Sequence, residues 1–74
     1  MSEATSELVA SFERTMNNCR VYEDEERLGH LLNEIGTLRG LAYALEAVGI
    51  CPHSEEFSHY IDVSQSLMKG LDDD

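Results

Sequence analysis

Residues 28–48, LGHLLNEIGTLRGLAYALEAV, carry the most regular hydrophobic pattern in this chain and decide its fold class. Apolar residues recur there at alternating intervals of three and four, the spacing of a helix that buries one side. They are Leu28, Leu31, Ile35, Leu38, Ala42 and Leu45. Leu32, Leu41 and Val48 widen the apolar stripe beyond a simple coiled-coil seam. The pattern predicts one long helix that packs against other elements.

The acidic run Glu23–Glu26 comes immediately before this pattern. Negative side chains favour the first turn of a helix, where they meet the positive end of the macrodipole. We therefore predict that the long helix begins near Glu23 and ends at Val48, since Gly49 and Pro52 prevent its continuation. The alternative is one unbroken helix over residues 6–48, although residues 23–27 lack an apolar side chain and favour a turn or an exposed patch.

Amphipathic segments lie on both sides of the long helix. In the first, apolar residues share one helical face from Ser6 onward, and a hydroxyl at Ser2 or Thr5 is suited to cap it. The weak helix formers Asn17-Asn18 predict its end. The last segment is predicted to start at Ser54, with acids in its first turn. Its apolar face comprises Phe57, Tyr60, Ile61, Leu67, Met68 and Leu71, with Ser64 among them.

These segments predict an all-α domain over residues 1–74, with residues 1–5 and 72–74 flexible. The three helices have roughly 14, 26 and 17 residues by their apolar spacing and form an up-down-up arrangement. Either both outer helices pack on the long one, or the second and third form a hairpin and the first reaches a partner subunit. A chain this short buries only about 60% of its unfolded surface, so we expect a homodimer or heterodimer.

The charge balance limits the classes of partner. Fifteen acidic residues against five basic ones give a formal net charge of −10. Because affinity for nucleic acids comes largely from Lys and Arg on phosphates, direct nucleic-acid binding is not expected. The N-terminus MSEATSELV has no basic region followed by an apolar one, and no run is long enough to cross a membrane. We therefore expect a cytoplasmic protein that does not bind membranes.

Small residues form a second face on the long helix, at Gly29, Gly36, Gly40, Ala44 and Ala47. Each glycine inside a helix costs about 0.5–1 kcal/mol relative to alanine. One interpretation is close packing by the other two helices of the same chain. The other is a docking surface for a partner protein, for which the candidate residues are Gly29, Gly36, Gly40, Leu38, Leu41, Leu45, Phe57 and Tyr60.

The sequence contains no nucleophile–base motif and no phosphate-binding loop, so we predict neither enzymatic activity nor a cofactor. Cys51, His53 and His59 are possible metal ligands, but they match no known spacing and lack a fourth ligand. We therefore predict no metal site. If the long helix is intact, it keeps Cys19 and Cys51 too far apart for a disulfide, so both are expected to be reduced.

One stretch matches a family pattern at Ile35, Leu38, Arg39, Leu45, Gly49, Ser64, Gln65 and Leu67. With these residues the segment 31–71 resembles the small sporulation phosphatases that dephosphorylate a response regulator. Those are helical hairpins with a Ser-Gln-x-Leu-Asp signature. The chain departs from them because Met68 replaces the acidic residue and the Gly49–Ser64 spacing is longer. The resemblance implies phosphatase activity, with Arg39, Ser64 and Gln65 as the residues to test.

In size and helical character the chain also resembles the small chaperones of type III secretion needle subunits and small acidic phage proteins that inhibit host machinery. The leading hypothesis from the residues is a non-enzymatic protein-interaction module, an adaptor, chaperone or inhibitor. A second hypothesis is an acidic mimic of nucleic acid that inhibits a DNA- or RNA-binding protein, with Glu23–Glu26 as its acidic cluster.

Overall fold

The computed structural model describes residues 2–72, which form three helices and contain no strand. They are α1 (Glu3–Asp24), α2 (Leu28–Ala47) and α3 (Glu55–Asp72). The predicted all-α, three-helix fold is confirmed. Glu3–Thr5 already belong to α1 and Asp72 ends α3, whereas the flexibility expected at Met1, Asp73 and Asp74 falls outside the described residues.

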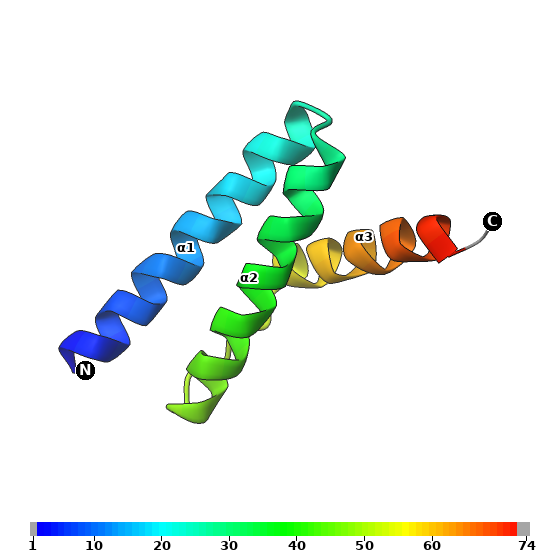
Figure 1. Cartoon of the computed structure of the whole chain (residues 1–74). Coiled ribbons are helices and arrows are strands. Elements are labelled where there is room, and N and C mark those ends of the chain that lie inside the picture. Colours follow the sequence, from blue (N-terminus) through cyan, green and yellow to red (C-terminus); the bar gives the residue numbers. More distant parts are fainter. Residues whose placement is uncertain (1, 73–74) are drawn as a thin grey trace.

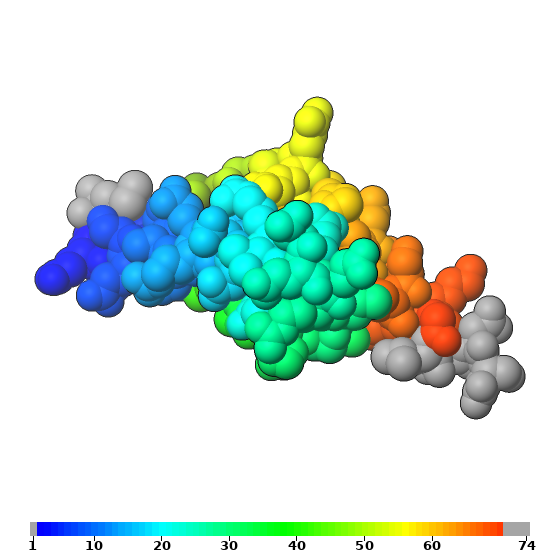
Figure 2. Space-filling model, turned by 90° about the horizontal axis from the view of Figure 1, so that it is seen from above, coloured from blue at the N-terminus to red at the C-terminus, as the bar shows by residue number. Residues whose placement is uncertain are grey.

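The arrangement of the helices differs from the predicted one. α1 and α2 run antiparallel as a hairpin, and α3 crosses behind α2 instead of lying alongside it (Figure 1). The orange C-terminal part of α3 extends beyond the hairpin on one side (Figure 2), and the molecule measures 46 × 22 × 18 Å. The predicted short first helix is also wrong, because α1 has 22 residues and α2 has 20.

The boundary between α1 and α2 explains this error. α1 continues through Asn17 and Asn18, because its apolar face extends past them to the fully buried Cys19. The two asparagine side chains are exposed, so they cost only their weak helix propensity. The acidic run therefore ends α1 rather than beginning α2. The chain reverses at Glu26, where φ is 57°, and the Arg27 amide donates to the Tyr22 carbonyl at 2.9 Å. Residues 6–48 thus form two helices.

The predicted helix caps are confirmed. Ser2 caps α1 by accepting a hydrogen bond from the Thr5 amide at 3.2 Å. Gly49 follows α2 with φ of 83°, a conformation that favours glycine. Ser54 caps α3 by accepting from the Phe57 amide at 3.1 Å.

The core lies where all three helices meet. α2 contributes half of the core cluster, and all of its heptad residues are buried except Leu28, which is 50% exposed. α1 and α3 supply the remaining core residues, and the Phe12 and Phe57 rings stack with centroids 5.8 Å apart. The core cluster comprises Met16, Cys19, Leu31, Ile35, Leu38, Ala42, Phe57 and Tyr60.

The two cysteines are free, as expected, and their environments differ. Burial of Cys19, followed by the nearby carboxylates Glu34 and Glu23, raises the pKa of its thiol to about 11. Because the thiolate is the reactive form, Cys19 is inert in the folded chain. Cys51 is exposed in the link between α2 and α3.

Candidate interaction surface

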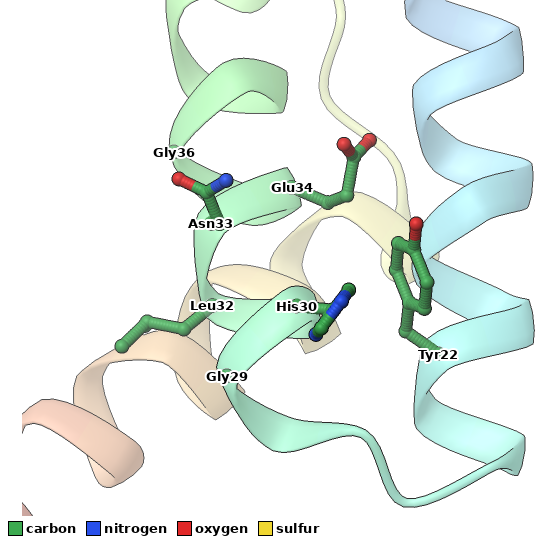
Figure 3. A pocket seen from close by; sticks show the side chains of 7 residues that line it. All are labelled: Tyr22, Gly29, His30, Leu32, Asn33, Glu34 and Gly36. Atoms are coloured by element: carbon green, nitrogen blue, oxygen red, sulfur yellow. The ribbon is translucent and has the colours of Figure 1, made fainter.

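One side of α2 faces away from both other helices, and we call it the outer face. Its residues recur at intervals of three and four, so they form one continuous stripe along the helix. They are Gly29, Leu32, Gly36, Gly40, Tyr43 and Ala47. All are exposed except the half-buried Leu32, and Tyr43 is 65% exposed. Figure 3 shows the N-terminal part of this stripe, where Gly29, Leu32 and Gly36 line one side of a shallow hollow. Its other lining residues are His30, Asn33 and Glu34 of α2 and Tyr22 of α1.

The glycines of the outer face have no packing role within the chain. A Cβ atom built on Gly29, Gly36 or Gly40 would meet no atom within 4 Å. Close packing by the chain's other helices, one interpretation of the sequence, is therefore wrong for these positions. The conformational cost of placing glycine in a helix is not offset by any contact that the described residues make there.

The outer face carries no charged side chain. The charged residues of α2 lie on its flanks: Glu34 is on the α1 side, where its carboxylate accepts a hydrogen bond from Asn18 at 3.4 Å. Arg39 and Glu46 are on the α3 side, where they line a cleft with Phe57. The solvent side of a helix normally carries charged residues, and a helix that is apolar all round is usually buried. The outer face thus lacks the charged residues that the solvent side of a helix normally carries.

The eight residues predicted for an interface fall into three groups in the structure. Gly29, Gly36 and Gly40 lie together on the outer face. Leu41 is half-buried on another side of α2, in a groove beside α1. The remaining four are buried in the monomer, where they hold the helices together; they are Leu38, Leu45, Phe57 and Tyr60, none more than 6% exposed. These four are not accessible to a partner in this structure.

Sequence reasoning missed Leu32 and Tyr43 as members of the exposed stripe. Both continue the interval of three or four residues that runs through Gly36 and Gly40. The signal was therefore present in the spacing. The spacing alone does not reveal this exposed stripe, however, because Leu32 also fits the spacing of the buried stripe. The position of α3 then decides which flank of α2 is covered.

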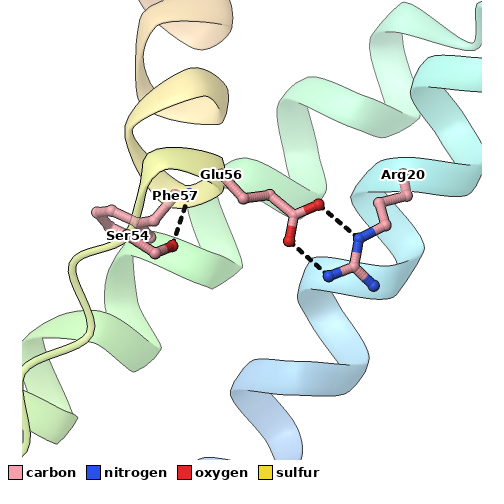
Figure 4. A network of polar contacts seen from close by, with 4 residues as sticks. All are labelled: Arg20, Ser54, Glu56 and Phe57. Atoms are coloured by element: carbon pink, nitrogen blue, oxygen red, sulfur yellow. Dashed lines mark hydrogen bonds and ion pairs between the residues drawn. The ribbon is translucent and has the colours of Figure 1, made fainter.

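Polar contacts fasten the start of α3 to the end of α1. The Arg20 guanidinium donates two hydrogen bonds to the Glu56 carboxylate, each 2.5 Å long (Figure 4). One turn further along, the His59 ring lies 2.7 Å from a carboxylate oxygen of Glu23. The hydrogen bonds and positive charge of Arg20 lower the pKa of the Glu56 carboxyl. This pair therefore joins α3 directly to α1, 36 positions away in the sequence.

We expect Glu56→Gln to unfold at a lower urea concentration than the unmodified chain at pH 7. Because the folded-state pKa of Glu56 is depressed, its contribution is present above the ordinary glutamate pKa of about 4.3 and is lost as pH falls below it. The difference in urea midpoint should therefore shrink as pH falls below that value and disappear once the pH is well below the lowered folded-state pKa of Glu56. The effect is small because the pair is partly exposed.

Glu7→Gln is the matched control, because Glu7 is exposed on α1 and makes no ion pair with the described residues. Its urea midpoint should equal that of the unmodified chain at neutral and at acidic pH. A Glu56→Gln defect that persists at the acidic pH would show that the side chain acts through packing rather than charge.

The other candidate residues are dispersed. Within residues 2–72, no group of three or more His, Cys, Asp or Glu side chains is placed to hold a metal ion. His53 instead lies 2.9 Å from Glu46. Of the residues named by the phosphatase resemblance, Arg39 and Gln65 are exposed, whereas Ser64 is 3% exposed and donates its hydroxyl to the Ile61 carbonyl at 2.8 Å.

Comparisons with known proteins add no relative: no family model matches the chain, and neither curated proteins nor solved structures give a significant match. Among residues 2–72, no helix combines the length and apolar character needed to cross a membrane.

Proposed function

We propose that this protein is a non-enzymatic interaction module that binds a partner protein through the outer face of α2. The observation that carries this proposal is the absence of charge from an exposed helix face in a chain with a net charge of −10. Solvation alone gives no reason to keep charged residues off such a face. A partner that covers it does, since unpaired charges are excluded from the centres of interfaces.

The glycines support the same function. Removing three side chains from one face leaves a smooth surface that another backbone can approach closely. The cost of these glycines within the monomer is then offset by contacts made only in the complex. Leu32 and Tyr43 add larger apolar groups beside them, and tyrosine is common at interfaces because it presents apolar area with a polar tip.

Site-directed photo-crosslinking tests this function. A benzophenone amino acid placed at Tyr43, the exposed aromatic residue of the outer face, should give a discrete crosslinked product after irradiation of the full chain in cells of the organism that encodes it. The same group at Ser66, which is exposed on α3, is the matched control and should give none. The product's mass distinguishes a second copy of the chain from another protein. Equal labelling patterns at the two positions would contradict the proposal.

A further inference from the structure

A small cleft opens between α2 and α3, beside the outer face. Its floor is apolar and comprises Ala42, Phe57 and Ile61, of which the first two are almost fully buried. Tyr43 lies on its rim, so the cleft and the outer face share one exposed residue. The volume is about 170 Å³. Ligand pockets for drug-sized molecules start at about 300 Å³, so this cleft has room for one apolar side chain.

The ends of the cleft differ in charge. Arg39 lies at one end and makes no ion pair with the described residues. At the other end Glu46 already has a partner, the His53 ring at 2.9 Å. Arg39 and Glu46 are seven positions apart in the sequence, which corresponds to about 10 Å of rise along the axis of α2. The cleft therefore combines an apolar floor with one available guanidinium, in a chain whose charge is otherwise dominated by acids.

We propose that this cleft binds the C-terminal residue of a partner chain, with its apolar side chain on the floor and its α-carboxylate on Arg39. This inference rests on the proposed function, because a partner that covers the outer face would also cover Tyr43 on the rim of the cleft. The planar guanidinium presents a fork of donors that matches a carboxylate. The occupant is thus a chain that ends in a residue such as leucine.

Geometry favours a terminal carboxylate over an acidic side chain. Arg39 and Ala42 lie one turn apart on α2 and line the same small cleft, so an anion bound by Arg39 lies beside the apolar floor. An α-carboxylate is attached to the same Cα atom as the apolar side chain. In an extended segment, the side chain of a neighbouring Asp or Glu points to the opposite face.

The net charge of −10 does not prevent this binding. At physiological ionic strength, exposed charges more than about 8 Å apart are largely screened. Glu46, the acid that lines the same cleft, is about 10 Å from Arg39 along the helix and is hydrogen-bonded to His53. The hydrogen bond with His53 leaves Arg39 as the side chain of this cleft that is available to pair with an added carboxylate.

Small-molecule probes test the cleft without knowledge of the partner. N-acetyl-leucine carries both required groups, N-acetyl-leucinamide lacks the carboxylate, and acetate lacks the side chain. We expect N-acetyl-leucine to shift the NMR amide signals of Arg39, Ala42, Tyr43 and Ile61, with a Kd on the order of 1–10 mM. The amide and acetate should bind about tenfold more weakly. No saturable shift at these residues, or equal binding of acid and amide, would overturn the proposal.

Arg39→Gln should bind N-acetyl-leucine and N-acetyl-leucinamide equally well. Arg14→Gln removes the same charge from an exposed site on α1, outside this cleft, and should keep the tenfold preference for the acid. If both variants lose the preference for the acid over the amide, only the overall charge of the chain matters. That result would contradict a specific carboxylate site at Arg39. Probe binding with no crosslink at Tyr43 would refute the proposed function alone, whereas a crosslink without probe binding would refute only the C-terminal anchor.

Discussion

Replacing Gly36 and Gly40 together by alanine should stabilise the isolated chain by about 1–2 kcal/mol, because each glycine inside a helix costs about 0.5–1 kcal/mol. The added Cβ atoms meet nothing within 4 Å, so no clash opposes this gain. For a domain of this size, the melting temperature should rise by about 4–8 °C per kcal/mol. Thermal unfolding followed by circular dichroism at low protein concentration measures the effect.

Gly49→Ala provides a control of opposite sign. Its φ of 83° disfavours any side chain although the surrounding space is open, so the substitution should lower the melting temperature. In the crosslinking assay, the Gly36→Ala, Gly40→Ala chain should give less product even though it is more stable, because the partner's backbone can no longer approach as closely. A double variant that is less stable than the unmodified chain would mean that these glycines pack against something in the monomer.

Leu38→Ala should destabilise the fold by about 2–5 kcal/mol, the range for truncating a buried leucine. Leu38 is 0% exposed in the core. Since small domains have a total unfolding free energy of only about 5–15 kcal/mol, this loss is a large fraction of the stability and should lower the urea midpoint clearly. Urea unfolding monitored by circular dichroism gives the change in free energy.

Leu41→Ala makes the same chemical change three residues further along α2. Leu41 is half-buried beside α1, so its loss should cost about 1 kcal/mol or less. The difference between the two changes in unfolding free energy separates the effect of core packing from the effect of losing apolar surface in general. Equal effects would contradict the assignment of Leu38 to the interior and of Leu41 to its edge.

The spacing of apolar residues was enough to predict which side of α2 is buried. Five of the six heptad residues are buried, because a repeat of three and four brings side chains to the same side of any α-helix, whatever packs against it. The cap at Ser54 and the stop at Gly49 were predictable for a similar reason. They satisfy backbone groups at helix ends through contacts only a few residues apart.

The point where α1 ends could not be predicted from local preferences. Asn17, Asn18 and the acids after Glu23 all favour a break or a new helix start, yet α1 runs to Asp24. Packing of Met16 and Cys19 into the core contributes more than these weak preferences, which amount to tenths of a kcal/mol per residue.

The sequence by itself determined three helices, their caps and the buried stripe of α2, because each depends on residues within a few positions of one another. Only the tertiary structure decided which remaining sides of α2 are covered. α1 lies against one flank, α3 crosses the other, and the stripe from Gly29 to Ala47 is left open. The contacts that join α3 to the hairpin link residues far apart in the sequence, such as Arg20 and Glu56, which are 36 residues apart. No local pattern encodes such a pairing, so the accessible face appears only once the chain is folded.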